Sequence, residues 1–238
     1  GPASTAPVAA AAAQGAAAVP GQPAPAAAPA AARERIEVKT DLYRLVFDSE
    51  GGSLIKAELL QHIDMADKSR NFLLLDESAQ RVYMAQTGLI GGSFPTHKTL
   101  MTAVPGPREL QDGQDAITVR FESPEQGGLK LVKTWTIQRG AYDIAVRHEV
   151  VNTGNVAVSP QLYLQLVRDG NPPPGESSFY STFTGPAVFT DAKKYQKVDF
   201  KDIENGKVDI PRDSPNGYVA MVQHYFATAW LLADGVQR

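Results

Sequence analysis

The chain has 238 residues, a formal net charge of −3 and no cysteine. The lack of cysteine excludes disulfides, thiol catalysis and thiolate-bound metals. Acidic and basic residues are interspersed, so the sequence offers no clustered cationic stretch of the kind that binds phosphates, and nucleic acid is not expected as a partner.

Residues 1–32 consist of Ala, Pro, Gly, Gln, Ser, Thr and Val, and the first charged residue is Arg33. The repeated prolines suppress helix, and alanine offers little apolar surface to bury. We therefore predict a disordered Ala/Pro-rich linker over residues 1–32. Residues 33–238 are predicted to form one large domain, which is long enough to build a core without disulfides or metals.

Beyond Arg33, apolar residues recur with a period of two. In residues 142–151, for example, Ile144, Val146 and His148 share one face of a strand, and Arg147 and Glu149 share the other. Such patterns predict strands over residues 35–40, 42–48, 53–61, 81–86, 117–121, 129–137, 142–151, 162–167, 195–200, 218–223 and 226–232. Only residues 63–69 suggest a helical turn.

Turn signals separate these predicted strands, among them Gly51-Gly52, Gly127-Gly128 and Asn205-Gly206. Short strands joined by such turns favour an all-β fold, a large antiparallel β-sandwich with little helix. Because the predicted strands outnumber those of an immunoglobulin domain, we expect a larger double sheet.

The sequence contains no nucleophile elbow, phosphate loop, dinucleotide fingerprint or zincin helix. His148 and Glu149 are neighbours on a strand and point to opposite faces, so they cannot act together as an acid–base pair. The histidines also lack the spacing of a metal pair. We predict no catalytic, cofactor-binding or metal-binding residues and no enzymatic activity, while a distant pair such as His97 with Glu122 stays open.

Aromatic residues on the predicted strands could form stacking platforms for sugars, or they could fill the core and edges of two sheets. The second interpretation is favoured because each residue lies on an alternating strand. The residues are Trp135, Trp230, Tyr142, Tyr163, Tyr218 and Tyr225.

Residues 170–186 interrupt the strand pattern with three successive prolines, Pro172 to Pro174. Proline cannot donate to a strand ladder, so the chain should leave the sheet here as a stiff loop. Phe179 and Tyr180 follow this loop. They either anchor it to the core or stay exposed as a docking point for a partner outside the cytoplasm.

Several collinear segments resemble the large periplasmic domain of the YidC family of membrane-protein insertases. At the carboxyl-terminal end, residues 217–230 (GYVAMVQHYFATAW) carry this resemblance, and residues 38–41 (VKTD) with Gly51-Gly52 carry it near the start. Between them lie QTGL at 86–89, KTWTIQRG at 133–140 and GPAVF at 185–189.

The resemblance implies a β-super-sandwich, similar to galactose mutarotase-like domains, on the periplasmic side of the bacterial inner membrane. The family inserts and folds nascent inner-membrane proteins, alone or with the Sec translocon and its SecDF complex. Because insertion resides in the membrane-embedded core, no catalytic residues carry over to this chain, which is expected to be a non-catalytic scaffold or partner-binding module.

The family's domain continues beyond the segment that ends at Trp230, so its final strands and helix are expected to be missing here, leaving unpaired edges near residues 226–232. Two alternatives to the insertase hypothesis stay open. One is a carbohydrate-binding or mutarotase-like carbohydrate-active sandwich. The other is a secreted adhesin or structural sandwich.

Overall fold

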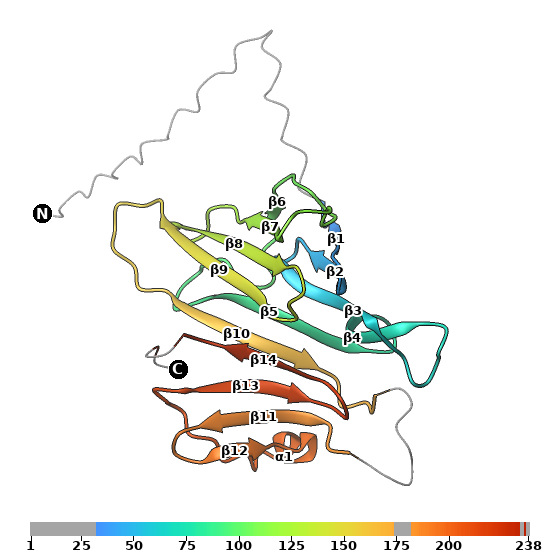
Figure 1. Cartoon of the computed structure of the whole chain (residues 1–238). Helices are drawn as coiled ribbons and strands as arrows, with labels where there is room; N and C mark the ends of the chain where they lie inside the picture. Colours follow the sequence, from blue (N-terminus) through green and yellow to red (C-terminus); the bar gives the residue numbers. More distant parts are fainter. Residues whose placement is uncertain (1–31, 174–181, 234–235, 237–238) are drawn as a thin grey trace, which may run out of the picture. The chain divides into compact units, whose positions relative to one another are not determined.

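A computed structural model describes residues 32–173, 182–233 and 236 of the chain. These residues form fourteen strands and one short helix (Figure 1). In chain order they are β1 (Arg35–Lys39), β2 (Tyr43–Asp48), β3 (Ser53–Ile63), β4 (Asn71–Glu77), β5 (Val82–Ile90), β6 (Thr102–Ala103), β7 (Ala116–Glu122), β8 (Leu129–Gln138), β9 (Ile144–Asn152), β10 (Gln161–Arg168), β11 (Gly185–Thr190), β12 (Lys194–Lys197), α1 (Phe200–Glu204), β13 (Gly217–Val222) and β14 (Ala227–Leu231). The predicted all-β class with little helix is confirmed.

The strands form three antiparallel sheets. Sheet 1 has the order β1-β2-β3-β4-β5-β10, with an additional pairing between β3 and β5. Sheet 2 has the order β6-β7-β8-β9, and sheet 3 has the order β12-β11-β13-β14. The main core joins Leu45 and Phe47 of sheet 1 to Phe121 and Trp135 of sheet 2. This packing of alternating inward faces confirms the predicted antiparallel sandwich.

The turn between β2 and β3 is buried, which is unusual because turns normally run over the surface. Gly51 and Gly52 have φ angles of 73° and 56°, and a Cβ on Gly51 would lie 2.3 Å from the carbonyl oxygen of His97. Their carbonyls accept hydrogen bonds from Lys133 and Trp135 of β8. The turn is therefore a point at which sheet 2 is bonded to sheet 1.

Three local predictions differ from the structure. The helical turn predicted over residues 63–69 is wrong: Ile63 ends β3, and Asp64 shapes the following hairpin loop by accepting a hydrogen bond from the Ala66 amide at 2.8 Å. The strand predicted over residues 195–200 ends at Lys197, and Phe200 begins α1. In addition, β4, β6 and β11 were not predicted.

No helix in the described part of the chain is long and apolar enough to cross a membrane.

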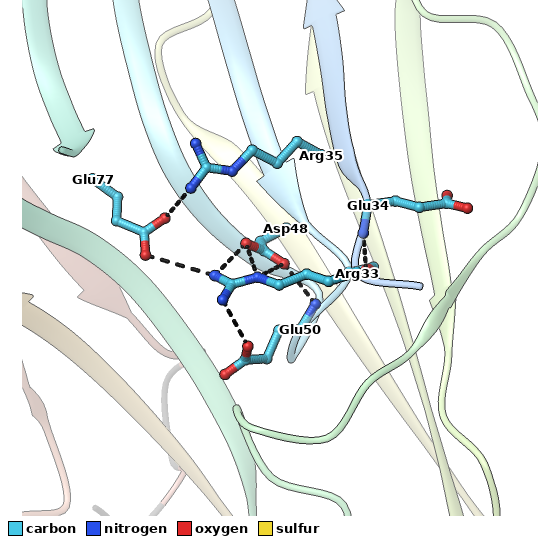
Figure 2. Close-up of polar contacts among 7 residues, drawn as sticks. Arg33, Glu34, Arg35, Asp48, Glu50 and Glu77 are labelled. Carbon is cyan, nitrogen blue, oxygen red and sulfur yellow. Dashed lines mark hydrogen bonds and ion pairs between the residues drawn. The ribbon is translucent and has the colours of Figure 1, made fainter. Parts of the chain in front are cut away.

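Arg33 anchors the beginning of the sandwich (Figure 2). Its Nε donates to both carboxylate oxygens of Asp48, at 3.0 and 2.8 Å, and its guanidinium forms ion pairs with Glu50 and Glu77. The Asp48 side chain is only 1% exposed, whereas that of Arg33 is 49% exposed. Arg33 thus reaches from the surface to satisfy a buried carboxylate beside the β2–β3 turn, which is what a buried charge requires.

Candidate functional site

A groove of about 980 Å³ opens between the sheets. One side is formed by inward-facing residues of β3, β4 and β5, the other by residues of β8 and β9, and β10 and β14 complete it. Its lining is mainly apolar, including Leu164 and Leu166 of β10 and Val146 of β9. Because side chains alternate along a strand, the predicted alternation of β9 and β10 explains why these residues share the groove.

Three outermost strands border the groove. Within the described residues, β9, β10 and β14 each have a ladder partner on one side only, namely β8, β5 and β13. The Trp230 indole of β14 donates to the carbonyl of Gln165 in β10 at 3.0 Å, which links sheet 3 to sheet 1. Unpaired backbone edges beside an apolar hollow are suited to adding an extended apolar strand.

Lys133 of β8 is a buried polar residue between sheets 1 and 2. Its side chain is fully buried, and Nζ donates to the carbonyl oxygens of Gly51 at 2.5 Å and Thr87 at 2.6 Å. Burial lowers the pKa of the Lys133 ammonium to about 7. Lys133 was not predicted as a site residue, although its place between Leu131 and Trp135 in an alternating strand puts it on the inward face.

His148 of β9 lines the groove, and its Nε2 lies 2.8 Å from the Thr87 hydroxyl. Burial lowers the pKa of His148 to about 4, with a further contribution from the Lys133 charge. Glu149 instead forms an ion pair with Arg147 at 2.9 Å on the opposite face. The predicted opposite orientation of the His148 and Glu149 side chains is confirmed.

The pair His97 and Glu122, which the sequence left open, has other partners. The Nδ1 atom of His97 lies 2.5 Å from the Tyr163 hydroxyl, and burial lowers the pKa of His97, with smaller effects of nearby lysines. Glu122 accepts a hydrogen bond from Arg120 at 3.0 Å. These contacts hold His97 against Tyr163 rather than against a carboxylate.

The aromatic residues differ in their surroundings. Trp135 is 2% exposed and packs in the main core, as the favoured interpretation predicted. Tyr218 stacks on Phe189 with ring centroids 5.5 Å apart. Tyr142 and Tyr225 line the groove and are 45% and 73% exposed.

The proposed docking residues Phe179 and Tyr180 lie outside the described residues. The strand β10 ends at Arg168, and residues 171–173 are not part of any strand, in agreement with the predicted departure of the chain from the sheet at the prolines. Among the residues that the structure describes, no group of three or more His, Asp or Glu side chains is arranged to hold a metal ion.

Comparison with known proteins gives one consistent family. Residues 35–238 match the YidC periplasmic domain. The membrane protein insertase YidC of Bordetella parapertussis is 50% identical over 213 residues, which cover 88% of this chain and 37% of that protein. The proteins of the same name from Janthinobacterium sp. and Dechloromonas aromatica are 47% and 45% identical, covering 86% and 93% of this chain. The chain spans 36% to 40% of the length of these three relatives.

Proposed function

The chain belongs to the YidC periplasmic domain family, and we propose that it is the periplasmic β-sandwich of a membrane protein insertase, where it acts as a non-catalytic scaffold and binding module. The match over residues 35–238 is the observation that carries this proposal. The contacts of His97 with Tyr163 and of His148 with Thr87 also favour a binding role, because neither histidine is paired with a carboxylate.

In this proposal the full-length protein lies in the bacterial inner membrane, with the sandwich on the periplasmic side. It inserts and folds nascent inner-membrane proteins, alone or together with the Sec translocon and SecDF. The name of the relatives, membrane protein insertase, supports membrane proteins as the clients. Insertion itself is assigned to the membrane-embedded part of the protein, outside the sandwich.

A deletion in the full-length insertase tests the non-catalytic role. Replacing residues 35–238, together with the closing strands and helix proposed below, by a flexible linker should not abolish the insertion of a client that is inserted without the translocon, because no reacting group is removed. Insertion into vesicles is measured as protection of the client from added protease. Complete loss of insertion, with the shortened insertase present in the membrane at its usual amount, would show that the sandwich takes part in the insertion step.

We also propose that residues 1–32 are a linker, and that in the full-length protein further strands and a helix complete the sandwich. An extended strand that pairs with β9 or β14 would place every second side chain in the groove. The apolar lining of the groove and the unpaired edges that border it support this arrangement.

Thiol labelling can test which chain occupies the groove, because the sequence contains no cysteine. Val146 is half-buried and lines the groove, whereas Thr118 of β7 is exposed. We expect a maleimide to label Val146→Cys at least about tenfold more slowly in the resting full-length insertase than in the fragment of residues 1–238. In the full-length protein the added strand would cover the groove, so labelling would require this strand to open locally.

The control Thr118→Cys should be labelled at the same rate in both proteins. If Val146→Cys reacts equally fast in both at rest and becomes protected only while a client is inserted, the groove binds clients and not strands of its own chain. That outcome would overturn the proposed completion of the sandwich and leave the family assignment intact.

A further inference from the structure

Lys133 is the only lysine or arginine that is fully buried among the described residues. It extends from β8 of sheet 2, and both of its acceptors belong to sheet 1: the carbonyl of Gly51 in the β2–β3 turn and the carbonyl of Thr87 in β5. One side chain therefore links the two sheets across the core. A neutral amine has two N–H groups, which is the number of acceptors present.

The surroundings of Lys133 supply little negative charge. His148 faces it from β9, and the positive charge of Lys133 disfavours protonation of this histidine. His97, on the loop after β5, is affected in the same way, and Glu50 in the β2–β3 turn is already paired with Arg33. The hydrogen bonds of the Lys133 side chain within the described residues go to the two carbonyl oxygens, and a buried cation without a carboxylate partner is costly.

We propose that Lys133 is a proton-sensitive strap between sheets 1 and 2: its hydrogen bonds hold the β2–β3 turn, and protonation of the amine places a charge without a carboxylate partner in the core, which favours opening of this contact to water. Because the same turn lies beside the Arg33 anchor, protonation also loosens the point at which the chain joins the sandwich. This device goes beyond the scaffold role, since it makes the rigidity of the sandwich depend on the pH outside the cytoplasm.

The direction of the pH dependence follows from proton linkage. The pKa of Lys133 is about 7 in the folded chain and about 10.4 in an unfolded chain. Between these values the unfolded state binds more protons, so stability rises with pH, and below about pH 7 the destabilisation is complete and constant. The pKa values of His148 and His97 are lowered, so these histidines affect stability at lower pH. The pKa values of Tyr43 and Tyr83 are raised to about 12, so these tyrosines affect stability only above about pH 9.5.

Urea unfolding between pH 7.5 and 9.5 isolates the effect. The folding equilibrium constant of the unmodified chain should rise by close to tenfold per pH unit. In Lys133→Met, which keeps an unbranched side chain one heavy atom shorter and removes the titrating group, this rise should disappear. The matched control is Lys130→Met, which alters an exposed lysine of the same strand and should retain the full rise.

Two further measurements keep the inference testable if Lys133→Met does not fold. In the unmodified chain, the NMR signal of the Lys133 ε-carbon should titrate near pH 7. Protection of the Gly51 and Gly52 amides against hydrogen exchange, corrected for intrinsic rates, should increase as the pH is raised from 7.5 to 9.5. A Lys133 titration near pH 10, or amide protection that does not change with pH, would overturn the proposal.

Discussion

Replacing Trp135 by alanine should lower the free energy of unfolding by about 3–5 kcal/mol, the range observed when a large aromatic side chain is removed from a core. Trp135 is 2% exposed, and its ring centroid lies 5.4 Å from that of Phe47 across the two sheets. Its Nε1 also donates to the Gly52 carbonyl at 3.0 Å. The substitution therefore leaves a cavity and an unsatisfied buried carbonyl at the same place.

Urea unfolding followed by far-ultraviolet circular dichroism would measure this loss, because tryptophan fluorescence is itself changed by the substitution. Trp135→Phe retains most of the packing and removes the indole donor, so it should cost less than Trp135→Ala. Tyr225→Ala alters a groove residue that is 73% exposed and should change stability by no more than about 0.5 kcal/mol. Equal losses in Trp135→Ala and Tyr225→Ala would show that the core is not centred on Trp135.

Gly51→Ala should destabilise the domain by about 2–4 kcal/mol, because backbone strain and steric overlap act together. The φ angle of Gly51 is 73°, in the left-handed region that disfavours side chains. An added Cβ would lie 2.3 Å from the carbonyl oxygen of His97, a backbone atom that cannot move aside as a flexible side chain could. The shift needed to relieve this contact would also displace the carbonyl that binds Lys133.

Gly113→Ala is the matched control, since Gly113 has a φ angle of 80° and no atom lies within 4 Å of its would-be Cβ. It should show only the conformational cost of about 1 kcal/mol. Chemical denaturation of both variants gives the comparison. If the two substitutions cost the same, the close packing of the β2–β3 turn against the His97 loop contributes nothing to stability.

Local sequence patterns were sufficient for most strands and for the face on which their side chains lie. The alternation in β9 placed His148 inward and Glu149 outward, as the structure confirms. The pattern failed for β4, where Phe72 to Leu75 form a continuous apolar run without a period of two. It also failed for β6, whose two residues are a strand only because they pair with β7.

The sequence by itself therefore determined the fold class, most strands and the faces on which residues such as His148 and Glu149 lie, because strand periodicity is a local property of the chain. Only the tertiary structure decided what Lys133 contacts, since its acceptors are backbone oxygens that lie 82 and 46 residues away along the chain. Backbone carbonyls are present in every residue and leave no mark in a sequence. The groove was likewise decided by tertiary structure, because its walls come from three sheets whose mutual arrangement depends on long-range packing.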